Sequence, residues 1–223
     1  CTKDSHCIQP YSCKNNQCSC TSSSYVSQWI VANSSSEFLY GPNCEYQRGQ
    51  TFIMDKDSQL VYVKAYLKRV TDSNCNNLGD GLNPLTGQVT MKIWKASSSH
   101  KPTGSMIASV TKDLTTVSSK STGAWSVFSF QNKNLQLDGD TEYVATLSST
   151  STKYKVYWQS WAKTNGSGGP VTNGYAVYKA PQVIGPIFPG GAPGKIPDEG
   201  TVLGGWQTTT SYDMAYELAY TVS

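Results

Sequence analysis

Histidine, the usual general base beside a nucleophile, occurs only twice in this 223-residue chain. His6 lies within a cysteine-rich segment and His100 in a serine-rich turn, and neither is near a nucleophile motif such as G-x-S-x-G. Both are predicted to be solvated turn residues. Asp213 and Glu217 share one face of a predicted strand, so they point in parallel and do not oppose each other across a cleft, as glycoside hydrolysis requires. We expect these acids at a sheet edge or on a solvent face, and we predict no catalytic residues and no enzymatic activity.

Oxygen-rich loops provide one candidate metal site. Carboxylates occur in Asp55-Lys56-Asp57, between Asn76 and Asp80, and in Asp138-Gly139-Asp140, and loop oxygens are the ligands that calcium prefers. None of these stretches matches an EF-hand, and aspartate beside glycine is also ordinary turn chemistry. The sequence favours turns and implies no cofactor. The alternative is one structural calcium ion, with Asp55, Asp57 and Asp80 as its candidate ligands.

The chain contains seven cysteines, at Cys1, Cys7, Cys13, Cys18, Cys20, Cys44 and Cys75. Residues 1–24 are too short to bury a core, so they are predicted to hold their shape through disulfides. Zinc is disfavoured because the ligand spacing C-x2-C is absent. An odd number of cysteines leaves one without an internal partner. Two alternatives remain open: Cys1 is lipidated, or another cysteine such as Cys44 or Cys75 bonds a neighbouring molecule.

Several features predict an extracellular or cell-surface location. Disulfides persist in oxidising compartments, and Asn33 and Asn165 each begin an N-glycosylation pattern. We expect a mature, processed chain, since no signal peptide is recognisable. The net charge of +3 without a basic cluster disfavours nucleic acid as a partner. No apolar run approaches the length of a transmembrane helix.

Hydrophobic alternation predicts an all-β fold. In the stretch 59–70, Val61, Val63, Ala65 and Leu67 alternate with Tyr62, Lys64, Tyr66 and Lys68, which indicates a strand with one buried face. Further strands are predicted at 25–32, 37–40, 50–54, 88–95, 106–112, 124–131, 143–147, 154–162, 174–180 and 212–222. We predict an antiparallel, jelly-roll-like β-sandwich over 25–223, with a proline- and glycine-rich excursion at 181–205.

Aromatic side chains form the third candidate site. Tyr62, Tyr66, Trp94, Trp158 and Trp161 have flat faces suited to stacking on sugar rings. The same residue types fill cores and subunit interfaces. Core, interface and glycan platform therefore remain alternatives for these rings.

The run from 50 to 158 resembles the choice-of-anchor domains of exported prokaryotic surface proteins, which are jelly-roll-like. The matching stretches are GQTF at 49–52, YLKRV at 66–70, GQVTMKI at 87–93, KPTGSMIA at 101–108, WSVF at 125–128, the run 135–143 and YDMAY at 212–216. The resemblance covers about half of the chain and implies a non-catalytic surface module. The loop containing Cys75 and the segment 181–205 depart from it. The stretch CTKDSHC at 1–7 resembles an EB-like cysteine knuckle.

We therefore expect a non-catalytic structural or adhesive protein of the extracellular space or cell surface. Its predicted partners are copies of itself or other surface proteins, since the 181–205 excursion is rich in apolar residues and suits a neighbour's sheet edge. The alternative function is a carbohydrate-binding module that uses surface tyrosine and tryptophan.

Overall fold

The computed structural model describes residues 11–14, 17–20, 25–29, 35–39, 47–71, 87–150, 154–162, 174–179, 205–209 and 212–222. Within these ranges the regular secondary structure consists of β-strands, all paired antiparallel, and two short 3₁₀ turns, η2 (Leu114–Thr116) and η3 (Gln131–Lys133). The all-β prediction is confirmed. None of the helical segments in these ranges is long and apolar enough to cross a membrane.

The first large sheet is built around β6 (Ser58–Thr71), the longest strand. One edge of β6 pairs with β9 and β10, and its other edge pairs with β16 and β12. We name it the β6 sheet. Its other strands are β3 (Tyr25–Trp29), β4 (Ser35–Leu39), β9 (Ala124–Ser129), β10 (Gln136–Leu137), β12 (Tyr154–Ala162), β15 (Tyr212–Met214) and β16 (Tyr216–Val222).

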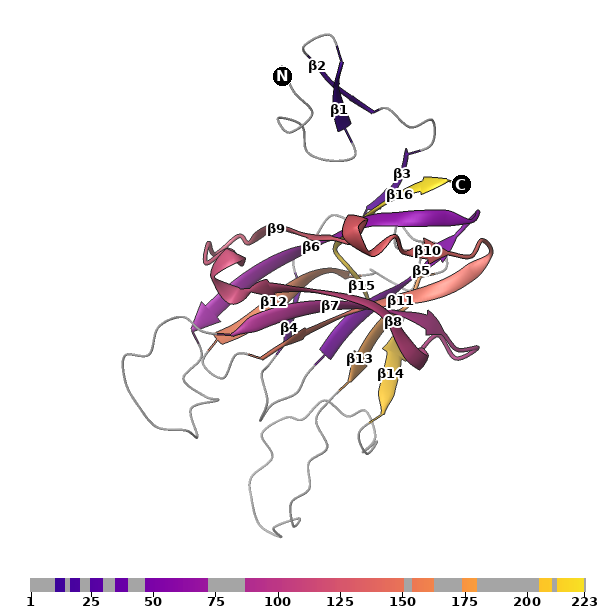
Figure 1. Cartoon of the computed structure of the whole chain (residues 1–223). Coiled ribbons are helices and arrows are strands. Elements are labelled where there is room, and N and C mark those ends of the chain that lie inside the picture. The colour runs from indigo at the N-terminus through magenta and orange to yellow at the C-terminus, as the bar shows by residue number, and fades with distance from the viewer. Residues whose placement is uncertain are drawn as a thin grey trace, which may run out of the picture.

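The second large sheet, the β5 sheet, has the order β14-β13-β5-β11-β7-β8. The two sheets lie one above the other in Figure 1, with β6 in the upper layer and β7, β8 and β11 in the lower one. The strands are β5 (Gln47–Met54), β7 (Gln88–Ala96), β8 (Pro102–Asp113), β11 (Thr141–Ser149), β13 (Ala176–Lys179) and β14 (Trp206–Thr209).

The hydrophobic core fills the space between the two sheets. The alternation of β7 is confirmed, because Val89, Met91 and Ile93 are all fully buried. The β6 sheet contributes side chains from β6, β9, β12 and β16 to the same core.

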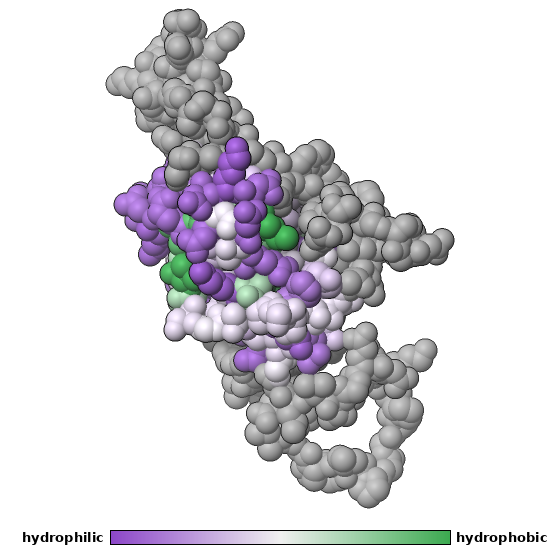
Figure 2. Space-filling view, turned by 90° about the vertical axis from the view of Figure 1, so that its right-hand side faces the viewer, coloured by the Kyte–Doolittle hydropathy of each residue, from purple (hydrophilic) through white to green (hydrophobic). Residues whose placement is uncertain are grey.

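Figure 2 shows one end of the molecule, where the described surface is mostly hydrophilic with only small hydrophobic patches.

A β-bulge changes the alternation of β6 at Val61. Ala219 of β16 pairs with Tyr62, whereas the next residue, Tyr220, pairs with Leu60. Val61 is therefore the extra residue, and Leu60 takes the core position. Val61 instead forms a small cluster with Tyr62 and Ala219. The prediction that Val61 faces the main core was wrong for this reason, while Val63, Ala65 and Leu67 lie in the core as predicted.

Gly49 permits a close approach at the centre of the β5 sheet. A Cβ atom at this position would lie 2.5 Å from the Ala145 carbonyl oxygen and 2.8 Å from a methyl group of Val177. Real Cβ atoms do not approach backbone oxygens so closely. β11 and β13 can therefore flank β5 at this point only because residue 49 has no side chain.

The two edge strands β8 and β9 differ in the regularity of their pairing. β8, at the end of the β5 sheet, pairs Ala108 with Ile93 but Thr103 with Lys95, so the residues between 103 and 108 bulge outward. Gly104 lies in this bulge with a φ of 66°. β9, at the edge of the β6 sheet, follows a regular register from Ala124 to Ser129.

The strands β1 (Tyr11–Lys14) and β2 (Gln17–Cys20) form a two-stranded sheet of their own. Their register places Cys13 opposite Cys18, and Cys20 pairs with Tyr11. Cys1, Cys7, Cys44 and Cys75 lie outside the described residues, as do Asn33, Asn165 and residues 181–204. The disulfides, the glycosylation and the role of the excursion remain predictions.

Candidate functional surface

The outer face of β6 carries the predicted ladder of tyrosines and lysines. Tyr62 is buried, and its hydroxyl donates to Glu217 Oε1 at 2.7 Å. Lys64 Nζ lies 2.8 Å from the same oxygen and 4.9 Å from the centre of the Tyr62 ring. β16 places Glu217 directly opposite Lys64. One carboxylate therefore binds both side chains, and Lys64 has its charge partner within the sheet.

Further along this face the aromatic rings contact neighbouring strands. Tyr66 meets Trp125 of β9 edge to face, with ring centres 5.2 Å apart and planes at 89°. Such pairs stabilise by about 0.5–1.5 kcal/mol beyond their buried area. Lys68 Nζ lies 5.1 Å from the centre of the Tyr157 ring on β12. The ladder of β6 is therefore covered on both sides by rings from its neighbours.

Three large apolar side chains on this face are exposed. Val70 is 43%, Trp125 37% and Val127 36% exposed. Trp125 pairs with Tyr66, and Val127 pairs with Lys64, so both β9 side chains extend the ladder to the edge of the sheet. We name Tyr66, Val70, Trp125, Val127 and Tyr157 the outer strip. Exposed aromatic and apolar residues among paired charges are typical of interaction surfaces.

Two of the other aromatic rings singled out from the sequence do not join this strip. Trp158 is fully buried, and its Nε1 donates to the Ala215 carbonyl at 2.7 Å, so it belongs to the core. Trp94 is half-buried on the outer face of the β5 sheet, where its Nε1 donates to Thr146 Oγ1 at 2.9 Å. The side chain of Trp161 lies outside the described residues.

Trp125 is the exposed ring that the sequence analysis did not select. The signal was present, since alternation along the strand predicted at 124–131 puts Phe128 and Phe130 on one face and Trp125 on the other. Both phenylalanines are fully buried. Odd-numbered residues of β9 consequently point outward.

Asp213 does not lie on a solvent face, and that prediction was wrong. It is fully buried, and its Oδ1 accepts a hydrogen bond from Gln50 Nε2 at 3.2 Å. Gln50 Oε1 accepts from the Met214 backbone N–H at 2.8 Å. These bonds connect β5 of one sheet to β15 of the other. Burial, reinforced by the Asp213 charge, raises the pKa of Tyr216.

The two acids also do not share a face. Asp213 contacts the facing sheet, whereas Glu217 is bound to Tyr62 and Lys64 on the outer surface. The predicted single strand is divided between the two acids, because β15 ends at Met214 and β16 begins at Tyr216. Asp213 therefore connects the two sheets, and Glu217 connects two strands of one sheet.

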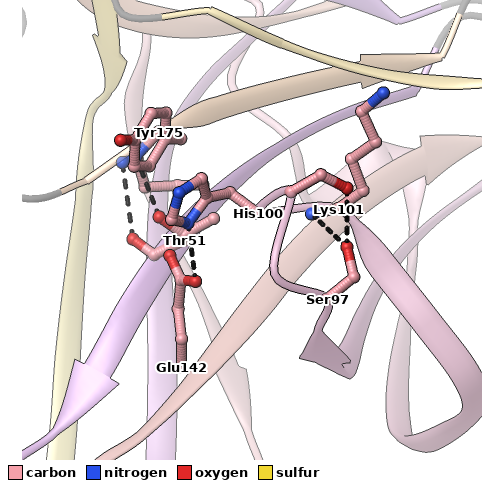
Figure 3. A network of polar contacts seen from close by, with 8 residues as sticks. Thr51, Ser97, His100, Lys101, Glu142 and Tyr175 are labelled. Atoms are coloured by element: carbon pink, nitrogen blue, oxygen red, sulfur yellow. Dashed lines mark hydrogen bonds and ion pairs between the residues drawn. The ribbon is translucent and has the colours of Figure 1, made fainter.

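His100 is a structural contact and not a solvated turn residue, which corrects the prediction. Its ring stacks on Tyr175, with centres 3.8 Å apart and planes at 11°. Its Nδ1 lies 2.8 Å from Glu142 Oε2. Its backbone has a positive φ of 61°, which is uncommon for a residue with a side chain. Figure 3 shows the imidazole held between these two side chains.

Backbone contacts complete this cluster. The Tyr175 N–H donates to Thr51 Oγ1 at 2.8 Å, and the Thr51 N–H donates to the Tyr175 carbonyl at 2.9 Å. In the turn, the His100 N–H donates to the Ser97 carbonyl at 2.8 Å. The turn between β7 and β8 is thereby tied to β11 and to the residue preceding β13 (Figure 3). Within the described residues no hydroxyl is hydrogen bonded to the imidazole, so the cluster can orient a histidine but shows no nucleophile for it to activate.

The candidate calcium ligands are divided between turns and the part of the chain not described. Asp57 Oδ1 accepts from the Gly139 N–H at 2.7 Å, which joins the β5–β6 turn to the turn before β11. Asp138 Oδ2 lies 2.9 Å from Lys95 Nζ, and this hydrogen bond raises the pKa of the lysine. Asp80 lies outside the described residues. No three metal-ligating acids, cysteines or histidines gather within the described ranges.

Lys112 is a half-buried cation that sequence patterning did not single out. It lies on β8, and its Nζ is 5.7 Å from the centre of the buried Phe128 ring on β9. Burial lowers its pKa. A charge directed inward on an edge strand disfavours pairing with another strand.

Comparisons with protein-family models and with curated proteins give no match to this chain.

Proposed function

We propose that this chain is a non-catalytic structural module of the extracellular space or cell surface that associates with copies of itself. The observation that supports the proposal is the outer strip, where Trp125, Val127 and Val70 are exposed together on one sheet face. Lys64, directly opposite Val127, already has its carboxylate partner, and Lys68, between Tyr66 and Val70, lies over the Tyr157 ring. Burying this strip would remove apolar surface from water without leaving the Lys64 charge unpaired.

The contacts made by the titratable side chains support a non-catalytic role. Asp213, Glu217, His100 and Glu142 are all held in contacts that connect strands or sheets. The cysteine spacing and the two glycosylation patterns favour an exported protein. The resemblance of the sequence to exported surface domains agrees with this location.

The experiment is sedimentation velocity of the full chain over a range of concentrations, together with the double variant Trp125→Ser/Val127→Ser. We expect wild-type protein to associate as its concentration rises and the variant to remain monomeric. The matched control is Met106→Ser/Ile107→Ser, which removes two exposed apolar side chains from the bulge of β8. A wild-type chain that stays monomeric throughout, or a control variant that dissociates equally, contradicts the proposal.

A second candidate is carbohydrate binding, favoured by the geometry of Trp125. Its exposed indole is held edge to face against Tyr66, which gives a fixed aromatic surface open to solvent. Sugar C–H faces stack on such rings. Binding of the monomeric chain to an immobilised glycan, lost in Trp125→Ala, would support this candidate.

A further inference from the structure

The outer edge of β9 has no partner strand among the strands that the structure describes. Within the described residues it pairs with β6 alone. The Phe130 N–H donates to the Val61 carbonyl at 2.8 Å, and this bond identifies which residues of β9 are hydrogen bonded to β6. Since antiparallel residues alternate, the even-numbered residues of β9 direct their N–H and C=O groups to β6. The residues whose N–H and C=O groups point outward are Trp125, Val127 and Ser129.

β9 lacks the features that normally protect an edge strand. It contains no charged residue and no proline, and its register with β6 is regular. β8, the edge strand of the facing sheet, has two such features: the bulge around Gly104 and the inward-directed Lys112. Bulges and inward charges both discourage pairing with another chain. Of these two edge strands, β9 is therefore the one that the described part of the chain leaves unprotected.

We propose that β9 pairs antiparallel with β9 of a second copy, about a two-fold axis centred on Val127. This inference rests on the proposed self-association and specifies its interface. With this centre Val127 faces Val127 of the partner subunit, and Trp125 faces Ser129 of the partner subunit. Trp125, Val127 and Ser129 then all form main-chain hydrogen bonds with the partner strand. An axis centred on residue 126 or 128 would instead leave one of these three residues without a partner in the facing β9.

The side chains of the strand are compatible with pairing to an identical copy. Because β9 carries no charge, no like charges meet across the axis. Ser129 is small, so it leaves room for the Trp125 indole of the facing strand. Two-fold interfaces place the same patch on both subunits, and an antiparallel strand pair meets this requirement.

The contact is short, so the association should be weak. β9 has six residues, and pairing along a single edge buries less than the about 1,200 Å² that marks stable complexes. The dimer is therefore expected at high protein concentration or where molecules are held close together. Measurements must extend to concentrations near the solubility limit.

The first test compares proline substitutions on the two edge strands. Val127→Pro removes an N–H that points away from β6, so β9 can keep its pairing within the molecule. Ser109→Pro is the matched control, since the bond from the Leu114 N–H to the Gly87 carbonyl places the Ser109 N–H on the outer edge of β8. We expect sedimentation velocity to show that Val127→Pro is monomeric and that Ser109→Pro associates like wild type.

The second test uses a disulfide and does not depend on how the proline is tolerated. Residues facing each other in a hydrogen-bonded antiparallel pair have Cα atoms about 5.5 Å apart, within the range of a disulfide. Val127→Cys should therefore form a covalent dimer on oxidation, with a 127–127 cross-linked peptide identified after digestion without reduction. Ser109→Cys should form no corresponding peptide.

The outcomes separate this inference from the proposed function. If wild type associates and Val127→Pro associates equally, the β9 pairing is wrong and self-association stands through another surface. If wild type is monomeric at all concentrations, both fail. If the monomer binds a glycan through Trp125 and no 127–127 peptide forms, the strip serves carbohydrate binding and the pairing is overturned.

Discussion

At the scale of single residues, Gln50 holds the two sheets in register. Its amide donates to Asp213 and its carbonyl accepts from the Met214 N–H, so both ends are used across the core. In a water-poor interior, a polar group that loses its partner costs more free energy than the bond itself contributes. The sequence did not reveal this role, because a glutamine beside Gly49 in a strand carries no sign of which sheet it will face.

Gln50→Ala is expected to lower the free energy of unfolding by about 1–3 kcal/mol, since two buried groups lose the partner they have in the native protein. Denaturation in guanidinium, followed by tryptophan fluorescence, measures the change. Gln136→Ala, at an exposed position of β10, is the control and should stay within about 0.5 kcal/mol of wild type. Equal stability of the two variants would contradict the role assigned to Gln50.

Lys112 predicts a pH dependence of stability. Its pKa in the folded protein is lowered by burial from 10.5. Between the lowered pKa and 10.5 the unfolded chain binds more protons than the folded one, so this residue makes the free energy of unfolding rise with pH. Lys112→Met removes that contribution, and the stability of wild type relative to the variant should therefore increase from neutral to alkaline pH.

The difference should be about 0.5 kcal/mol or less, because a half-exposed side chain remains partly solvated. Denaturation curves for both proteins near neutral pH and near pH 10 measure it. Lys133→Met, at an exposed position of η3, reports the background effect of removing one positive charge. A stability difference that falls with pH would show the opposite sign and reject the argument.

At the scale of elements, alternation predicted the strands where one face is buried. β7 and the second half of β6 follow it, because the core selects apolar residues at every second position. It failed for the beginning of β8, because the strand predicted at 106–112 in fact starts at Pro102 and includes the bulge around Gly104. It also failed for β14 (Trp206–Thr209), whose four half-buried residues show no apolar alternation.

The His100 cluster leads to a prediction about one element, the turn between β7 and β8. His100→Asn keeps a residue that tolerates positive φ but removes the ring stack on Tyr175. The backbone amides of Tyr175 and Thr51 should exchange hydrogen about fivefold faster, as expected from losing about 1 kcal/mol of ring packing. Hydrogen-exchange mass spectrometry measures this. Ser99→Ala, in the same turn, should leave exchange unchanged.

At the scale of the whole molecule, the candidate surface was only partly predictable. The sequence indicated the Tyr62–Lys68 ladder, because period-two alternation defines a face without knowledge of its neighbours. It could not show that Glu217 would meet Tyr62 and Lys64, since that contact depends on the pairing of β16 with β6. Trp158 looked like the other tryptophans but lies in the core, because Val156 and Trp158 share the inward face of β12 while Tyr157 faces outward.

Reduction should affect the two parts of the molecule differently. The described core contains no cysteine, whereas five of the seven cysteines lie in the first 20 residues. A reductant is therefore expected to unfold the segment before residue 21 and to leave the thermal unfolding of the sandwich unchanged. Before reduction, the intact mass should fall short of the all-thiol value by about two daltons per bridge, since each bridge joins two cysteines. Seven free thiols under non-reducing alkylation would contradict this.

The bulge at Val61 bears on how this sequence can change in length over evolution. Anywhere else in β6, losing or gaining one codon would turn one half of the strand inside out, moving its lysines into the core. At Val61 the ladder with β16 already contains an extra residue, and the neighbour on the other edge changes from β9 to β10 at the same point. A homologue lacking this residue can therefore keep every other side chain of β6 on its present face. Length variation within this strand should concentrate at this position.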